Sequence, residues 1–283
     1  MVALREVEHA GHLGVELRDD EVQMIVLHSV GPRIAWFGLR EQDNLLYWDS
    51  AAEHRRGSWR LYGGHRLWIT RPLADESEEI YEPDNAPCRL ERIPDGVCIT
   101  SPPSALALEK SLAITVRDRR WTIEHRLRNV GQLLWSGGAW ALTCTAPRES
   151  TLYRVPLGGG PPAWDVATIL IPLRWGGSHT SRLDDPQISL TADALELRPR
   201  EDEAKRMLLA PRGRLEMHDP ERGTFCKEAP FDPDATYPAG TNLAVYVGPQ
   251  RFMVELETMS PLRTLPPGAT LTHAETWTLA ASS

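Results

Sequence analysis

The sequence lacks the short motifs that usually mark a metal, nucleotide or nucleophile site. Its 283 residues include only four cysteines, none of them in a C-x-x-C pair: Cys88, Cys98, Cys144 and Cys226. Six of the nine histidines show no spacing of i, i+2 or i+4 that would bring two imidazoles to one metal ion: His9, His12, His28, His54, His179 and His218. We therefore expect no metal and no cofactor.

Positive charge and long apolar runs are also scarce. The chain has 31 basic and 39 acidic residues and a net charge of -8, which is unlike a nucleic-acid-binding protein. No stretch approaches the roughly 18 apolar residues that a membrane-spanning helix needs. Charges at positions 5, 6 and 8 precede any apolar run, unlike a secretory signal. These absences predict a cytoplasmic protein with reduced thiols that act as small core hydrophobes, and a small-molecule partner rather than nucleic acid or a membrane. The oligomeric state stays open.

Helical periodicity is nearly absent, and the strongest helical candidate is the short segment REDEAKRML at 200–208, which can also be read as a loop entering a strand. Short alternating runs such as VQMIVLHSV, WTIEHRLRNV and FMVELETM recur instead, and Gly, Pro, Asp or Asn bounds them. The 23 prolines and 21 glycines fall mainly between these runs. This pattern predicts an all-β sandwich of many antiparallel strands.

The Pro/Gly-rich segment VPLGGGPPAWD, residues 155–165, divides the chain near its middle. It could be a linker between two domains or a long loop within one. Strands of the same style continue on both sides, and neither half has a distinct composition. We therefore expect a single domain that covers residues 1–283.

Two carboxylates share one face of the expected strand FMVELETM. Because side chains alternate along a strand, Glu255 and Glu257 lie on the same face, roughly 6 to 7 Å apart. If the pair is partly buried, each carboxylate raises the pKa of the other, and such a group can act as a general base near neutral pH. The alternative is that both glutamates simply face water.

The segment LYGGHRLWITRP, residues 61–72, places His65 and Arg66 directly after Gly63 and Gly64. A glycine pair lets the backbone bend sharply and lets a ligand approach closely. Histidine is a natural proton carrier near neutral pH, and arginine binds paired oxygens. His125 shares a strand face with large apolar residues, which favours a core or groove position.

Tryptophan is the most abundant aromatic residue, with 10 Trp against 6 Tyr and 4 Phe. Its wide apolar ring suits the C–H face of a sugar as well as a protein core. Four tryptophans lie near polar or Gly-rich turns, where they could line a groove: Trp36, Trp59, Trp68 and Trp140. Core packing is the alternative for each of them.

Four segments, in this order, resemble the galactose mutarotase-like superfamily, which includes aldose 1-epimerases and hexose-phosphate epimerases. They are GPRIAWFGLREQDNLLYW (31–48), YGGHRLWITRP (62–72), LRNVGQLLWSGGAWAL (127–142) and YPAGTNLAVYVGPQRFMVELETMSPLRTLPPGATLTHAETWTL (237–279). The most specific part is the last one, in which a Glu-bearing strand precedes SPL, LPPG and ETWTL. The resemblance implies a β-supersandwich with a sugar groove on one of its sheets.

The resemblance also implies roles for individual residues. Glu257 matches the general base of family mutarotases, and Glu255 would bind the sugar or tune the base. His65 and Arg66 match a segment that places sugar-binding side chains, whereas the position of Arg33 is often structural in the family. Trp140 stands near the place of the family's general-acid histidine. His65 would then take over as acid, with His125 as a second candidate. Our predicted substrate-binding residues are Arg66, Glu255, Trp68, Trp140, His125 and Arg33.

Three functional hypotheses follow from these residues. The first is a sugar isomerase of the aldose 1-epimerase kind, with Glu257 as base and His65 as acid. The second is a sugar-binding protein that has lost the general acid, which the tryptophan at position 140 favours. The third is a sandwich adapted to a ligand that is not a sugar.

Overall fold

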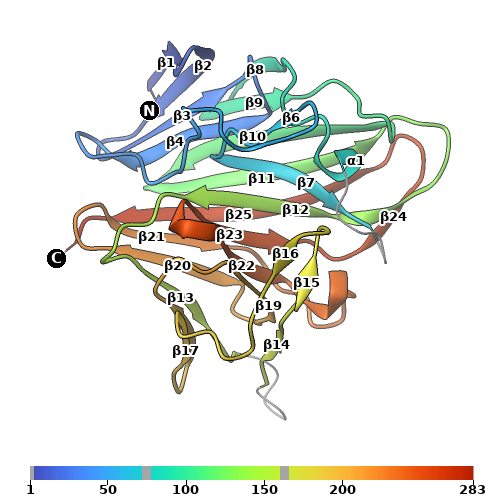
Figure 1. Cartoon of the computed structure of the whole chain (residues 1–283). Helices are drawn as coiled ribbons and strands as arrows, with labels where there is room; N and C mark the ends of the chain where they lie inside the picture. The colour runs from blue at the N-terminus through green and yellow to red at the C-terminus, as the bar shows by residue number, and fades with distance from the viewer. Residues whose placement is uncertain (1–2, 72–77, 160–165, 283) are drawn as a thin grey trace.

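The structure, a computed structural model, describes residues 3–71, 78–159 and 166–282. Two large antiparallel sheets face each other and enclose the core (Figure 1). This architecture confirms the predicted all-β sandwich. The part of the chain that the structure describes contains no helix long and apolar enough to cross a membrane.

The first sheet has 11 strands, and its strand β24 pairs with β12 outside the main order. In spatial order its strands are β1 (Ala3–His9), β2 (His12–Arg18), β3 (Val22–Leu27), β4 (Arg33–Leu39), β7 (His65–Thr70), β12 (Trp135–Thr145), β23 (Val254–Met259), β22 (Leu243–Val247), β19 (Ala204–Leu209) and β14 (Thr168–Leu170), with β24 (Arg263–Leu265) beside β12.

The second sheet has 10 strands. In spatial order they are β17 (Ile188–Leu190), β18 (Ala194–Leu197), β13 (Leu152–Pro156), β20 (Arg214–Asp219), β21 (Gly223–Glu228), β25 (Thr270–Ala280), β11 (Arg120–Asn129), β10 (Leu108–Arg117), β9 (Gly96–Thr100) and β8 (Arg89–Ile93).

Several short elements lie outside the two sheets. Two hairpins are formed by β5 (Arg55–Arg56) with β6 (Trp59–Arg60) and by β15 (Arg174–Trp175) with β16 (His179–Thr180). The helical turns among the described residues are α1 (Glu78–Tyr81), η1 (Pro238–Gly240) and η2 (Pro249–Arg251).

The segment 200–208 is the strongest helical candidate in the sequence, but the structure has a strand there. Residues 204–209 form β19, which pairs antiparallel with β22. The neighbour β22 is a fully buried apolar strand, and tertiary pairing overrides a weak local helical preference. Residues 160–165 of the Pro/Gly-rich segment lie outside the described residues. The strands on either side of that segment, β13 and β14, belong to different sheets.

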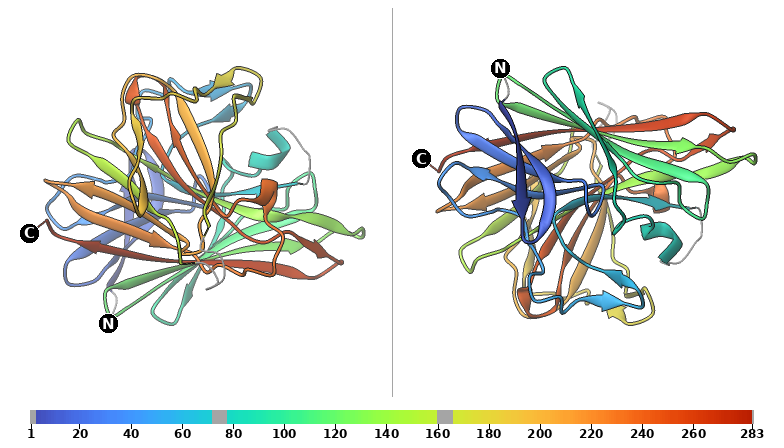
Figure 2. Two further views of the ribbon diagram at one scale, coloured as in Figure 1. Left: turned by 90° about the horizontal axis from the view of Figure 1, so that it is seen from below. Right: turned by 90° about the horizontal axis from the view of Figure 1, so that it is seen from above.

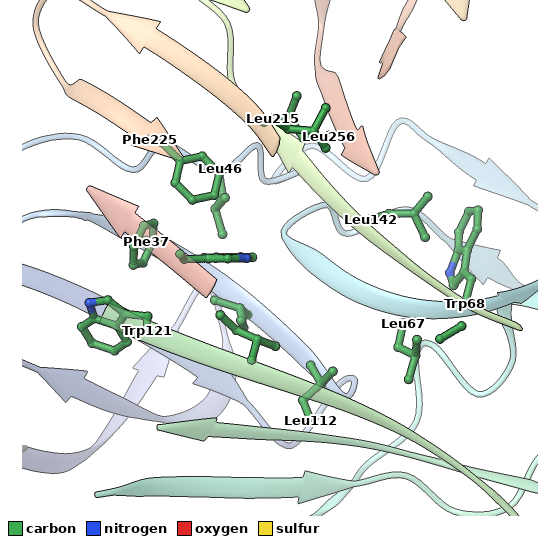
Figure 3. Close-up of a cluster of buried hydrophobic side chains, with 14 of the residues drawn as sticks. Phe37, Leu46, Leu67, Trp68, Leu112, Trp121, Leu142, Leu215, Phe225 and Leu256 are labelled. Carbon is green, nitrogen blue, oxygen red and sulfur yellow. The ribbon is translucent and has the colours of Figure 1, made fainter. Parts of the chain in front are cut away.

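Aromatic rings from both sheets meet in the core. Phe37 of the first sheet makes edge-to-face contacts with rings of the second, at centroid distances of 5.8 Å to Trp121, 5.5 Å to Phe225 and 5.2 Å to Trp277. Figure 3 shows Phe37, Trp121 and Phe225 together with leucines of both sheets, among them Leu112 and Leu142. Large rings bury much apolar surface and prefer this geometry, so they fix how the sheets are stacked.

The central strands of the first sheet are buried on both faces. Every residue of β22 and β23, and all but the last residue of β7, is buried. One face packs on the second sheet, and loops and hairpins cover the other. Because side chains alternate along each strand, charged residues on the second face lie beneath those loops.

Candidate functional site

A cavity of about 610 Å³ lies on the face of the 11-stranded sheet that points away from the second sheet. The sheet contributes Arg66 and Trp68 from β7, Lys205 from β19, Tyr246 from β22 and Glu255 from β23. The surrounding walls come from hairpin β5–β6, the end of α1, hairpin β15–β16 and the segment around η2. Both views of Figure 2 place hairpin β5–β6, in light blue, beside hairpin β15–β16, in yellow.

Strand pairing aligns three of these residues across the sheet. Lys205 lies opposite Tyr246, and Tyr246 lies opposite Glu255. Directly opposed residues of an antiparallel pair share a face of the sheet. Glu255 also lies opposite Cys144 of β12. The registers of four strands therefore bring these residues to one face, although they are far apart in the sequence.

Arg66 and Glu255 form a buried ion pair at the cavity. Arg66 Nη2 donates to Glu255 Oε1 at 2.9 Å, and Arg66 Nη1 donates to Cys144 Sγ at 2.9 Å. Burial lowers the pKa of Arg66, but Cys144, Glu255 and Asp84 outweigh that effect, so the net shift of this pKa is upward. Arg66 is therefore a fixed positive charge beside an acceptor oxygen that lines the cavity.

Glu257 lies next to the cavity but does not line it. Its side chain is completely buried, with Oε2 accepting from Trp140 Nε1 at 2.8 Å and Oε1 accepting from Lys205 Nζ at 3.2 Å. Burial raises the pKa of Glu257, and Glu255 adds to this rise while Lys205 opposes it. The two glutamates share a face, as alternation predicts, but only Glu255 of this pair lines the cavity.

The structure places His65 and His125 in the core rather than at the cavity. Both side chains are fully buried, and His65 Nε2 lies 2.7 Å from His125 Nε2 of the second sheet. Along β7, Arg66 and Trp68 point into the cavity, so alternation turns His65 to the opposite face. The lining of this cavity therefore includes neither His65, predicted as the acid, nor His125, predicted as a sugar contact.

The glycine pair before His65 accommodates the backbone rather than a ligand. Gly63 and Gly64 have φ of +89° and +70°. A Cβ atom at Gly64 would lie 2.2 Å from the carbonyl oxygen of Ile34, and one at Gly63 would lie 2.3 Å from that of Tyr47. Both residues therefore allow β7 to pass close to neighbouring chain segments.

His65 and His125 belong to a buried polar network that joins the sheets. His125 Nδ1 donates to the His273 carbonyl at 2.8 Å, which leaves His125 Nε2 to accept from His65 Nε2. His65 Nδ1 then accepts from Thr143 Oγ1 at 2.9 Å, and Thr143 Oγ1 accepts from Lys227 Nζ at 2.9 Å. Each of these atoms has a hydrogen-bond partner.

This network also contains a group of possible metal ligands, since donor atoms of His65, His125 and Glu275 lie within 4.8 Å of one another. Two nitrogens bound to one tetrahedral zinc ion would be roughly 3.4 Å apart, whereas the two Nε2 atoms are 2.7 Å apart. The Lys227 ammonium also lies 2.9 Å from Glu275 Oε1. The group therefore fits a hydrogen-bonded network rather than a metal site.

Arg33 and Trp140, two further residues predicted to bind the substrate, lie behind the cavity. Arg33 is fully buried and pairs with Asp84, with Arg33 Nη2 at 3.1 Å from Asp84 Oδ1. Asp84 Oδ2 accepts from Trp59 Nε1 at 2.9 Å, so Arg33 supports the cavity wall through Asp84. Trp140 and Trp68 make an edge-to-face contact at a centroid distance of 5.5 Å. Neither Arg33 nor Trp140 lines the cavity, whereas Trp68 does.

Several cavity residues gave no clear signal in the sequence. Lys205 fell in the segment assigned to a possible helix, although Lys205, Met207 and Leu209 alternate as in a strand. His179 Nδ1 lies 2.6 Å from Glu203 Oε1, and the His179 ring stacks on Trp175 at 5.5 Å. Hairpin β15–β16 has two residues per strand, which is too short for a periodic pattern.

The hydrogen-bonding environment of Glu203 fixes its charge. Burial raises the pKa of this carboxyl, but hydrogen bonds from His179 and Tyr246 outweigh burial and lower it. Tyr246 donates to Glu203 Oε1 at 2.6 Å. Glu203 thus links hairpin β15–β16 to the sheet beneath it.

Comparisons with known proteins identify the fold. No protein-family model matches the chain, and no curated protein matches it significantly. Solved structures do match. A galactose mutarotase-like protein from Lactobacillus casei ATCC 334 is 7% identical with a TM-score of 0.63, and the match covers 98% of this chain and 100% of that chain.

Two other solved structures give the same result. A galactose mutarotase related enzyme from Lactobacillus acidophilus is 9% identical with a TM-score of 0.60, over 99% of this chain and 98% of that chain. A candidate aldose 1-epimerase from Escherichia coli K12 is 11% identical with a TM-score of 0.63, over 99% and 100% of the two chains. The chain therefore has the galactose mutarotase-like fold, as the sequence resemblance predicted.

Proposed function

We propose that this protein binds a monosaccharide, or a derivative of one, in the cavity over the 11-stranded sheet. The observation that carries the proposal is the meeting of aromatic rings with the Arg66–Glu255 ion pair in that one cavity. The cavity volume of about 610 Å³ is within the range of roughly 300 to 1,000 Å³ that is usual for small-molecule sites.

The apolar part of the cavity suits the C–H faces of a sugar ring. Trp59, Trp68 and Tyr81 line one part of it, and the Trp68 and Tyr81 rings stack at a centroid distance of 3.9 Å. Trp175 and Phe252 line it from other elements. Flat aromatic rings offer wide apolar contact at fixed orientations, which supports binding of a rigid ring with alternating polar and apolar surfaces.

The polar part of the cavity suits sugar hydroxyl groups. The Arg66 guanidinium offers hydrogen-bond donors, and Glu255 offers acceptor oxygens a few ångströms away. Because the two groups fix each other's orientation, neither has to be ordered when a ligand binds, which favours affinity. A sugar with neighbouring hydroxyls can bind such a donor–acceptor pair with two oxygens.

Isomerisation at the anomeric carbon is the catalytic form of this proposal. It needs a base that reaches the anomeric hydroxyl, and Glu255 is better placed for contact with a ligand than Glu257, which Trp140 and Lys205 cover. We therefore propose Glu255, rather than Glu257, as the base. The non-catalytic alternative, a sugar-binding protein without anomer exchange, is favoured by the absence of His65 from the cavity lining.

Binding and polarimetry together test the proposal. Calorimetric titration with a panel of monosaccharides, including D-glucose and D-galactose, is expected to detect binding, and polarimetry on fresh α-D-glucose and α-D-galactose is expected to show faster mutarotation. Binding without acceleration supports the non-catalytic alternative. No binding of any sugar in the panel contradicts the proposal and favours a different ligand class.

A further inference from the structure

Among the described residues that line the cavity, Lys205 is the lysine, and contacts with neighbouring side chains hold its ammonium group. Its side chain is 7% exposed. Nζ lies 3.2 Å from Glu257 Oε1, 4.9 Å from the centre of the Trp140 ring and 5.9 Å from that of Tyr246. Contact with two ring faces and a carboxylate fixes a side chain that is usually flexible.

Glu257 is a fully buried carboxylate beside the cavity, and its burial requires a physical explanation. A fully buried carboxylate is costly unless it is paired and hydrogen-bonded. Here Trp140 and Lys205 are its partners, and the carboxylate holds the ammonium group at the edge of the cavity. The Glu257–Lys205 pair therefore presents a proton on Nζ while the balancing charge remains behind it.

Lys205 and Glu255 are separated by a distance that suits a sugar ring. The strand register places Tyr246 between them in the sheet. Neighbouring strands are about 4.8 Å apart, so the two backbones are roughly 10 Å apart, and both side chains reach into the same cavity. An acid and a base in such positions can contact opposite sides of one ring.

We propose that Lys205 is the catalytic proton donor to the ring oxygen of the sugar, with Glu255 as base and Glu257 as the positioning residue of Lys205. This inference rests on the proposed sugar-binding function. In the family that the sequence resembles, a general-acid histidine stands near the position that Trp140 occupies here. Lys205 would supply the acid in its place, whereas the sequence by itself assigns this role to His65.

Glu255 removes the proton of the anomeric hydroxyl, the C1–O5 bond breaks with its electron pair on O5, and O5 takes a proton from Lys205 Nζ. The open-chain aldehyde rotates about C1–C2. O5 then attacks the other face of C1 and returns its proton to Lys205, while the new hydroxyl regains its proton from Glu255. Nothing is oxidised or reduced.

The two cavity histidines are already engaged in other contacts. His54 Nδ1 lies 3.3 Å from the Tyr47 hydroxyl, and its ring stacks on Phe252 at 4.1 Å. His179 Nδ1 is bonded to Glu203. Both residues lie on covering segments rather than in the sheet. Sites on strands hold their groups more precisely than sites on loops, which favours Lys205 over His54, while His179 is already paired with Glu203.

The decisive comparison is Lys205→Arg against Lys205→Met. Arginine retains the positive charge and the partner for Glu257 but does not release a proton near neutral pH. We expect both variants to lose at least 100-fold in kcat/KM for α-D-galactose or α-D-glucose mutarotation, since general acid catalysis contributes about 10² to 10⁴. Calorimetric binding of the same sugar by Lys205→Arg is expected to persist. A Lys205→Arg variant that keeps more than a tenth of the activity overturns the proposal.

Two further variants separate chemistry from folding. Lys205→Met leaves Glu257 buried without its cation, so the double variant with Glu257→Gln removes the pair as a neutral unit; if the double variant folds and is active, the proposal is overturned. Glu257→Gln alone removes the charge that favours protonated Lys205. We expect the alkaline limb of its pH–rate profile to move to lower pH, a shift that a structural role would not produce.

Failure of this inference differs from failure of the proposed function. If the wild type binds the sugar without faster mutarotation, the role of Lys205 is overturned and the proposed binding function stands. If the wild type binds neither sugar of this test nor any other sugar of the panel, the proposed function fails, and the role of Lys205 fails with it.

Discussion

Arg66 Nη2 and Glu255 Oε1 lie 2.9 Å apart, although 189 residues separate the two in the chain. They come from β7 and β23, which lie on either side of β12 in the 11-stranded sheet. Both are buried, and both line the cavity. The ion pair therefore contributes to the fold and to the proposed site at the same time.

Glu255→Gln is expected to lower both stability and activity. Breaking a buried ion pair costs about 3 to 5 kcal/mol, and Asp84, 3.9 Å from Arg66, compensates in part. We expect a loss of about 3 kcal/mol in the free energy of unfolding, measured by urea titration. Loss of the base should also lower kcat/KM for mutarotation by at least about 100-fold.

Glu53→Gln is the matched control, because Glu53 also lines the cavity but is exposed. Its unfolding free energy should stay within about 0.5 kcal/mol of the wild type. Equal effects of the two substitutions would contradict the role given to the Arg66–Glu255 pair.

Trp175→Ala should weaken sugar binding without unfolding the protein. Trp175 is half-buried on hairpin β15–β16 and lines the cavity, so its removal takes away one apolar surface for the ligand. We expect an affinity loss of about 10-fold, equivalent to about 1.4 kcal/mol, measured by calorimetry. Trp48→Ala is a suitable control, since Trp48 is also half-buried but is outside the cavity lining. Unchanged affinity in Trp175→Ala would argue against this cavity as the sugar site.

Acid should destabilise the buried histidine network. Burial lowers the pKa of His65, His125 and His273, the last from 6.5 to about 3. Below pH 6.5 the unfolded chain therefore binds more protons than the folded chain, and the free energy of unfolding falls as the pH falls. For His273 alone the loss at pH 5 is roughly 2 kcal/mol. Denaturant titrations between pH 7.5 and pH 5 measure the slope.

The carboxylate of the same network acts in a different pH range. Burial raises the pKa of Glu275, but Lys227 and the histidines outweigh burial and lower this pKa below 4.5. Its contribution is therefore lost only in stronger acid. His273→Gln should flatten the slope between pH 6.5 and 5, whereas His28→Gln, outside the network, should not. A wild type equally stable at pH 7 and pH 5 would contradict this account.

Gly64→Ala should prevent normal packing of β7. The added Cβ would lie 2.2 Å from the Ile34 carbonyl oxygen at a φ of +70°. We expect a loss above about 3 kcal/mol, which combines backbone strain with a steric clash. The control is Gly268→Ala, where φ is +81° and nothing lies within 4 Å of the added atom. It should lose only about 1 to 2 kcal/mol. Similar melting temperatures for the two variants would show that close packing at Gly64 is unimportant.

The sequence predicted the fold well because its signals are local. Alternation along short runs and turn residues between them identify antiparallel strands without knowledge of their partners. The same alternation places Glu255 and Glu257 on one face, as they are in β23. At 200–208 a short segment had no clear period, and the pairing of β19 with β22 decided its conformation.

The site was predicted less completely, because alternation states only that His65 and Arg66 point to opposite sides of β7. Which side faces the second sheet depends on how the sheets are stacked, and the stacking turned His65 to His125 and Arg66 to the cavity. Lys205 reached the site through the register of β19, β22 and β23. By itself the sequence determined the strands and which residues share a face, since both follow from backbone geometry. Only the tertiary structure decided which face is covered by loops and which distant residues meet there, because strand order and register depend on contacts across the whole chain.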